Sequence, residues 1–185
     1  ILAIVAVHLK TKGKLDKDTV ITTVMANSGF DEAMKENGIT VVRTAVGDRY
    51  VVEEMHKNSY TLGGEQSGHI VFGKHATTGD GTLTALQILS IMHQTKKTLS
   101  ELAKIMSVYP QIILNILVKE KKPLEKMPRI QTAIQHIEKE IKGRVFVRYS
   151  GTQNMCRIMI EGKSKDQITK SAEELAKIIK EELGI

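Results

Sequence analysis

The sequence has one cysteine, no tryptophan and three prolines among 185 residues, and each scarcity excludes a class of protein. A single thiol, Cys156, cannot form an internal disulfide, which excludes a disulfide scaffold and predicts a reducing, cytoplasmic location. An apolar content of 41% is too high for a disordered chain, and low proline excludes collagen. Only 4% of the residues are aromatic, which weakens the case for stacking against single-stranded nucleic acid.

Long hydrophobic runs are also missing. The apolar stretch Ile1–Leu9 is about half as long as a membrane-spanning helix. It lacks an initiator methionine, a basic segment and a cleavage site, so it does not predict a signal peptide. Ile1, Ile4, Val5 and Leu9 share one helical face, which favours a chain that begins within a helix, as a fragment would.

The positive charge is concentrated in the second half of the chain. Residues 93–185 contain 18 Lys and Arg against 11 Asp and Glu, whereas residues 1–92 contain 9 and 10. A basic region suggests an anionic partner, which would be a phosphate ester, a nucleic acid or a membrane surface. A solvated lysine-rich surface is the alternative, and for most of these lysines it is the better interpretation.

Strand and helix patterns alternate over residues 1–107, which predicts an α/β/α domain with a mixed sheet. The expected strands are Val20–Ala26, Ile39–Thr44 and Tyr60–Gly63. The expected helices are Phe30–Glu36, Asp48–Lys57, Asp80–His93 and Thr98–Met106. In the long helix Asp80–His93 the predicted apolar face consists of Leu83, Leu86, Ile88, Leu89 and Met92.

The pattern changes after residue 107. The expected elements are a strand Ile112–Val118, a helix Ile130–Ile141, two strands Arg144–Arg148 and Met155–Glu161, and a helix Lys165–Leu183. This β-α-β-β-α order predicts a small α+β domain over residues 108–185, in which one sheet is accompanied by two helices.

A candidate phosphate site lies between the last two strands. Arg148, Ser150, Gly151 and Thr152 come within five positions, and Arg157 follows. Hydroxyl and amide donors, a glycine that admits close backbone approach and guanidinium groups are what a phosphate requires. The alternative is an ordinary polar hairpin turn.

A second candidate is the glycine-rich stretch Gly63–His69. Glu65, Ser67 and His69 offer donors and acceptors at alternating positions, which suits sugar hydroxyls. A serine hydrolase is a competing interpretation, but Ser67 does not stand in the G-x-S-x-G pattern. A glycine-rich hairpin with a buried His69 is the purely structural alternative.

Thr77–Gly81 precedes the long helix and predicts a helix cap. Glu65, Asp80 and a histidine (His69 or His75) could be imagined as metal ligands. However, their spacing matches no known metal site, so no metal is predicted in this chain.

Taken together, these motifs resemble the α-D-phosphohexomutase superfamily. GGEQSGHI is similar to the family's sugar-recognition loop, and its Gln66 is most like the glucosamine branch. RYSGTQNMCRIMIEG is similar to the phosphate-binding loop R-x-S-G-T-E-x-x-x-R, with Gln153 where the family usually has Glu. TAVGDRYV and TTGDGTLTALQIL match in order and spacing, so that the resemblance covers essentially the whole chain.

The resemblance implies four domains in the intact enzyme, of which this chain looks like the third and fourth. The family's phosphoserine and its D-x-D-x-D-R magnesium loop do not occur here. By resemblance, the intact enzyme interconverts glucosamine 6-phosphate and glucosamine 1-phosphate through a phosphoserine and a bisphosphate intermediate. Mg²⁺ would be bound upstream of this fragment, and the fragment alone would be inactive.

The resemblance also implies roles for individual residues. Glu65, Ser67 and His69 would bind the sugar, and Arg49 would be an additional basic group near the reacting centre. The non-reacting phosphate would be bound by Arg148, Ser150, Gly151, Thr152 and Arg157.

The expected partners are a hexosamine phosphate and the upstream domains of the parent chain, without nucleic acid or membrane. Two alternatives remain open at this point. One is a phosphomannomutase/phosphoglucomutase, which would differ in the sugar held, and the other is a stand-alone anion- or RNA-binding module.

Overall fold

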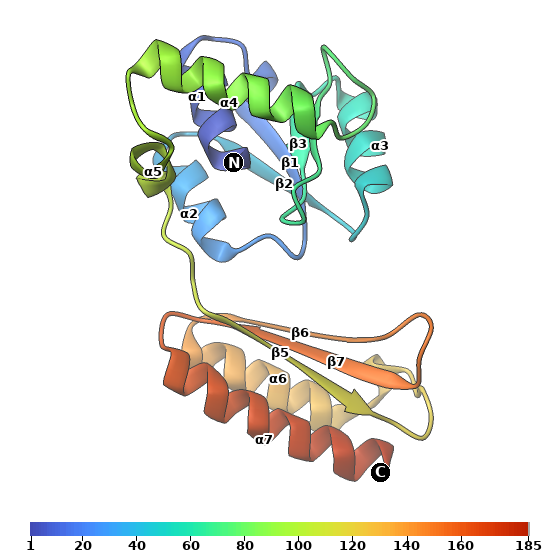
Figure 1. Ribbon diagram of the computed structural model, residues 1–185. Helices are drawn as coiled ribbons and strands as arrows, with labels where there is room; N and C mark the ends of the chain where they lie inside the picture. The colour runs from blue at the N-terminus through green and yellow to red at the C-terminus, as the bar shows by residue number, and fades with distance from the viewer. Residues whose placement is uncertain (185) are drawn as a thin grey trace. The chain divides into compact units, whose positions relative to one another are not determined.

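The computed structural model describes residues 1–184. The chain divides into two compact units, Ile1–Val108 and Tyr109–Ile185 (Figure 1). The order of elements confirms the expected fold class, an α/β unit with a mixed sheet followed by a smaller α+β unit. No helix in the described part of the chain has both the length and the apolar character needed to cross a bilayer.

The first unit is built on a four-stranded sheet in the order β2-β1-β3-β4. Its strands are β1 (Thr19–Thr23), β2 (Thr40–Thr44), β3 (Leu62–Gly64) and β4 (Ile70–Phe72). The pairs β1–β2 and β1–β3 are parallel, while β3 and β4 form an antiparallel hairpin. β1 ends three residues earlier than expected, because the chain turns after Thr23 and the Asn27 side chain caps the next helix.

Helices cover both faces of this sheet. The helices α1 (Leu2–Thr11), α2 (Ser28–Glu36) and α4 (Gly81–Thr95) pack with Val20, Ile70 and Phe72. On the other face α3 (Asp48–Asn58) packs with Ile21 and Val71. Because neighbouring strand residues point to opposite faces of the sheet, Val20 and Ile21 pack against helices on opposite faces. Short helical turns complete the unit, namely η1 (Asp16–Asp18), α5 (Leu99–Leu102) and η2 (Ala103–Ile105).

One expectation about the helices of this unit is wrong, and another is confirmed in part. In α4, Leu86 and Leu89 are 59% and 58% exposed, whereas Ile88 and Ile91 are buried. The helix is apolar on more than one face, so the 3.6-residue period did not identify the buried stripe. The helix expected over Thr98–Met106 is one α-helical turn that continues as a 3₁₀ turn to Ile105.

The second unit is a three-stranded antiparallel sheet in the order β5-β7-β6 with both long helices on one face (Figure 1). Its elements are β5 (Gln111–Leu117), η3 (Leu124–Lys126), α6 (Pro128–Ile141), β6 (Arg144–Tyr149), β7 (Met155–Glu161) and α7 (Lys165–Leu183). Ile116, Cys156, Ile158 and Ile160 point toward the helices and form the core with them.

The opposite face of this sheet carries alternating polar and apolar rows. Strand register places Gln111, Glu161 and Arg144 in one row, and Ile113, Met159 and Phe146 in the next. A third row contains Asn115, Arg157 and Arg148. The side chains of this third row therefore project from the face that the helices leave uncovered.

Candidate functional site

The candidate sugar-binding residues lie at the carboxyl edge of the parallel strands. Since β1, β2 and β3 run in the same direction, the connections that follow them emerge at one edge of the sheet. In open α/β sheets this edge is where ligands usually bind. The connection after β3 is the turn Glu65–His69, and the connection after β2 contains Gly47.

The turn itself is tight and exposed. The backbone N–H of Glu65 donates to the carbonyl of His69 at 2.9 Å, and that of Gly68 donates to the carbonyl of Glu65 at 3.1 Å. Gly68 has a φ of +99°, which favours glycine. His69 is exposed, so the alternative of a glycine-rich hairpin with a buried histidine is wrong for that residue.

A backbone amide holds the carboxylate of this turn. The N–H of Gly47 donates to Glu65 Oε1 at 3.1 Å, which links the β2–α3 connection to the β3–β4 turn. Beside it, Ser67 Oγ and His69 Nδ1 are 3.0 Å apart and share a hydrogen bond whose direction depends on the histidine tautomer. Carboxylate, hydroxyl and imidazole thus stand on one short turn.

A pocket of about 200 Å³ adjoins this turn within the first unit. Glu65 and Gln66 form its polar side, and Phe30 and Ile70 contribute apolar walls. Thr22 also lines it, and its hydroxyl donates to the carbonyl of Gly64 at 2.9 Å. The pocket has the mixed character that a sugar ring requires, with apolar surface for its face and acceptors for its hydroxyls.

Arg49 is held on its own helix. Its Nε donates to Glu53 Oε1 at 2.8 Å, and its guanidinium lies over the ring of Tyr50 at 5.6 Å. The bond to Glu53 raises the pKa of Arg49, which remains cationic. The interactions of its side chain are therefore with α3 and not with the turn Glu65–His69.

The segment before α4 has a structural role. Asp80 caps the helix, since its carboxylate accepts from the N–H of Leu83 at 2.9 Å. Within residues 1–184, no three His, Cys, Asp or Glu side chains come together in a way that could hold a metal ion.

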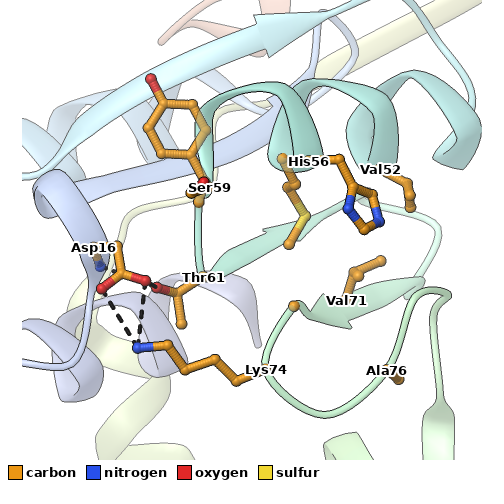
Figure 2. A pocket seen from close by; sticks show the side chains of 11 residues that line it. Asp16, Val52, His56, Ser59, Thr61, Val71, Lys74 and Ala76 are labelled. Atoms are coloured by element: carbon orange, nitrogen blue, oxygen red, sulfur yellow. Dashed lines mark hydrogen bonds and ion pairs between the residues drawn. The ribbon is translucent and has the colours of Figure 1, made fainter.

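A further pocket of about 260 Å³ lies beside the end of α3 (Figure 2). Its polar groups bind one another, because Asp16 accepts from the Thr61 hydroxyl and forms an ion pair with Lys74 at 3.3 Å. The bond to Thr61, followed by Lys74, lowers the pKa of Asp16. Since these groups are already paired, the pocket offers a ligand mainly apolar surface.

In the second unit the two predicted arginines are direct neighbours. Arg148 on β6 and Arg157 on β7 are cross-strand partners on the uncovered face. The Nε atom of Arg148 is buried and has no hydrogen-bond partner, whereas Arg157 Nε donates to Asn115 Oδ1 at 2.8 Å. Among the described residues, no carboxylate forms an ion pair with either arginine. Like charges directly opposite on a sheet repel, and an anion bound to both guanidinium groups would relieve that repulsion.

The turn between these strands is supported from the β5–α6 connection. Lys121 Nζ donates to the carbonyl of Ser150 at 2.7 Å, and the Tyr149 hydroxyl donates to the carbonyl of Lys122 at 2.7 Å. The hydroxyl groups of Ser150 and Thr152 make no hydrogen bond within the described chain, and the space beside Gly151 is open. Two free hydroxyls therefore accompany the arginine pair.

Sequence analysis missed three contributors to these sites. Gly47 acts through its backbone amide, Lys121 binds a backbone carbonyl, and Asn115 lies 42 residues from the arginine it contacts. The period-2 alternation of β5 places Asn115 on the uncovered face, but only the strand register shows which arginine it meets.

Family models match both units. The model described as phosphoglucomutase/phosphomannomutase, alpha/beta/alpha domain III matches residues 1–109, and the C-terminal domain of the same family matches residues 113–178. The chain belongs to the phosphoglucomutase/phosphomannomutase family, which is the phosphohexomutase class expected from its motifs.

The curated relatives are more specific. Phosphoglucosamine mutase of Geobacter metallireducens is 50% identical over 186 residues, and that of Caldanaerobacter subterraneus subsp. tengcongensis is 51% identical over 189. Each alignment covers 100% of this chain but only 41% and 42% of the relative, so the chain spans about two fifths of the length of these enzymes.

Solved structures confirm the fold. N-acetylphosphoglucosamine mutase of Aspergillus fumigatus superposes with a TM-score of 0.82 at 20% identity, over 98% of this chain and 43% of that one. An N-acetylglucosamine-phosphate mutase in its product complex gives a TM-score of 0.77 at 17% identity, over 96% of this chain and 43% of that one. At these identities the likeness concerns the fold alone.

Proposed function

We propose that this chain is the sugar- and phosphate-binding part of a phosphoglucosamine mutase, which interconverts glucosamine 6-phosphate and glucosamine 1-phosphate. The observation that carries this proposal is the pair Arg148 and Arg157, which are cross-strand neighbours and form no ion pair with a carboxylate in the described chain. The turn that joins their strands adds the free hydroxyls of Ser150 and Thr152. Relatives of that name, about 50% identical, support the choice of reaction.

In this proposal the second unit binds the phosphate that does not react. Arg148 and Arg157 supply the positive charge, the hydroxyls of Ser150 and Thr152 supply neutral donors, and Gly151 allows close backbone approach. Charge-assisted bonds from guanidinium groups to phosphate are roughly twice as strong as neutral hydrogen bonds. This unit would therefore provide most of the affinity.

The first unit would select the sugar. Gly47 occupies one oxygen of the Glu65 carboxylate, which leaves the other oxygen to accept from a sugar hydroxyl. Ser67 and His69 can each donate or accept, because the hydroxyl donates in one histidine tautomer and Nδ1–H donates in the other. Such groups suit a substrate that binds in two orientations with different hydroxyls presented to the same turn.

Phosphoryl transfer itself needs groups that we place outside these 185 residues. A phosphoserine would pass its phosphoryl group to the free sugar hydroxyl, which loses its proton. The resulting bisphosphate would then reorient in the site. The serine oxygen would then recover a phosphoryl group from the other position. Mg²⁺, held by another part of the mutase, would neutralise charge on the phosphoryl group. Positioning by this chain would supply the orientation that such transfer requires.

The proposed partners are a hexosamine phosphate and the remaining part of the same mutase, in the cytoplasm. Neither nucleic acid nor a membrane belongs to the proposal. Arg49 remains a candidate for a charge near the reacting centre, although it would have to leave Glu53. We also propose that the two units divide the work, residues 1–107 holding the sugar and residues 108–185 the phosphate.

The test combines binding and turnover. Purified chain is titrated with glucosamine 6-phosphate by NMR, and we expect the amides of residues 65–69 and 150–152 to shift. Glucose and mannose 6-phosphates should shift residues 150–152 equally but residues 65–69 less. The same chain, supplied with Mg²⁺ and hexose bisphosphate, should not interconvert the two glucosamine phosphates.

Three outcomes would contradict the proposal. Absence of shifts at residues 150–152 would refute the phosphate site. Larger shifts of residues 65–69 with glucose or mannose phosphate would favour a phosphomannomutase/phosphoglucomutase. RNA binding with steep salt dependence, without sugar-phosphate binding, would favour an anion- or RNA-binding module instead.

A further inference from the structure

The row of Asn115, Arg157 and Arg148 crosses all three strands of the second unit. Arg157 stands in the middle of this row on the central strand β7, with Asn115 on one side and Arg148 on the other. Its Nε donates to Asn115 Oδ1 at 2.8 Å. Of the three guanidinium nitrogens, Nε is therefore occupied, and within the described chain the two terminal nitrogens remain for another acceptor.

The chemical nature of the acceptor matters. An amide oxygen fixes the orientation of a guanidinium without cancelling its charge, whereas a carboxylate at the same place would form a salt bridge. The same face offers that contrast one polar row away, where Arg144 is bound by the buried carboxylate of Glu161 at 3.0 Å. Arg144 is thereby neutralised, while Arg157 keeps its full charge.

Because Arg148 lies directly opposite, an undirected Arg157 side chain would turn away from it. Repulsion between facing like charges favours rotamers that separate them. Asn115 lies on the side of Arg157 away from Arg148, so the bond to Asn115 is compatible with this separation. It fixes the orientation of the Arg157 guanidinium through Nε and leaves its terminal nitrogens available.

We infer that Asn115 is a positioning residue of the phosphate site, which holds Arg157 by Nε so that its terminal nitrogens face the same anion as Arg148. This inference rests on the proposed function of the second unit. The ligand class is a tetrahedral dianion, namely the phosphate group of a sugar phosphate, and inorganic sulfate is a suitable probe for it.

The experiment uses the complete chain and measures sulfate affinity by NMR titration. Replacing Asn115 by alanine should weaken sulfate binding about fivefold, since one orienting hydrogen bond is lost. Asn115→Asp should weaken it by roughly ten- to thirtyfold, because the new carboxylate pairs with Arg157. Asn115→Gln, which retains an amide oxygen, should restore binding to within about twofold of the original chain.

Two further measurements separate positioning from a structural role. The ¹H–¹⁵N signal of Arg157 Nε should be sharp in the original chain and in Asn115→Gln, and broadened by solvent exchange in Asn115→Ala. Gln135→Glu is the matched charge control, because it adds the same charge on exposed α6, a helix on the other side of the sheet. It should leave sulfate affinity unchanged.

Each contrary outcome has a distinct meaning. If Arg148→Ala weakens sulfate binding while Asn115→Ala and Asn115→Asp do not, Asn115 only joins two strands and the inference is wrong. If Arg148→Ala and Arg157→Ala also bind sulfate normally, the phosphate site itself is refuted. An equal loss in Asn115→Asp and Gln135→Glu would show a general charge effect and would also overturn the inference.

Discussion

In the first unit the candidate residues lie on connections between strands, whereas in the second unit the two arginines lie within strands. The carboxylate of Glu65 already has the amide of Gly47 as a partner, and Ser67 is paired with His69. By contrast, Arg148 Nε has no partner, and Arg148 faces another cation across the sheet.

This difference determines how much each group can contribute to the free energy of ligand binding. A group that is satisfied before the ligand arrives must exchange one partner for another, so its net contribution to binding is small. A group that is buried and unpartnered gains the full value of a new bond. Under the proposed function, the first unit would therefore choose between sugars, and the second would hold the phosphate tightly.

The largest expected effect concerns stability, at the other end of the second sheet. The Glu161 side chain is 1% exposed and binds Arg144. Glu161→Ala would leave Arg144 without this partner in a partly buried position, and we expect a loss of roughly 3 kcal/mol in the unfolding free energy of this unit. Hydrogen exchange of the β5, β6 and β7 amides measures it.

Glu173→Ala, at an exposed position on α7, is the control and should change these exchange rates little. Equal exchange in the two variants would contradict a structural role for the buried carboxylate.

The next effect tests the phosphate site directly. Arg148→Ala should weaken sulfate or glucosamine 6-phosphate binding by about 1.5–3 kcal/mol, which corresponds to roughly ten- to a hundredfold. Arg129→Ala removes an equal charge that is paired with Glu181 on the helical side, and should have little effect. Isothermal titration calorimetry of both variants measures these affinities. Similar affinities for Arg148→Ala and Arg129→Ala would contradict the proposal that the second unit binds the phosphate through Arg148.

A smaller effect is expected at the sugar turn. Glu65→Gln keeps an oxygen for Gly47 but loses charge, so glucosamine 6-phosphate should bind about three- to tenfold more weakly. Sulfate affinity and the melting temperature should be nearly unchanged, because Glu65 is only partly buried. Glu36→Gln, at an exposed position of α2, is the matched control. A loss of sulfate affinity in Glu65→Gln would blur the proposed division of roles.

The smallest signal comes from the single thiol, which belongs to the second unit. Cys156 is buried, and desolvation raises its pKa to about 11. At pH about 8 only about one thiol in a thousand is ionised, so alkylation should be slow and should accelerate when the unit unfolds. Fast labelling of the native chain by iodoacetamide would show that β7 opens more readily than its packing indicates.

The local patterns of the chain predicted the fold, and the family models confirm the class. Strands and helices of the second unit were identified within a few residues because their apolar residues alternate cleanly, as in β5 and α6. In α4 the prediction failed for Leu86 and Leu89, which are apolar but exposed. Because this helix carries apolar residues on more than one face, their spacing does not show which face is buried.

The candidate sites were predictable in part. Motifs placed Glu65, Ser67 and His69 on one turn and Arg148 near Arg157, and their functional roles remain predictions. Contacts that depend on strand register or on backbone amides could not be predicted from the sequence. Neither the bond of Asn115 to Arg157 nor that of Gly47 to Glu65 has a local signature, because the partners lie 42 and 18 residues apart.

The facing guanidinium groups of Arg148 and Arg157 also couple folding to the surrounding medium. Their repulsion exists only when the sheet is assembled, because the unfolded chain lets the two side chains separate. An anion that occupies the row binds the native state alone and shifts the unfolding equilibrium by mass action. The melting temperature of the second unit should therefore rise with sulfate concentration beyond the general effect of ionic strength, and its amides should exchange more slowly in phosphate than in chloride. The concentration of such an anion would in this way also affect how long the unit survives proteolysis.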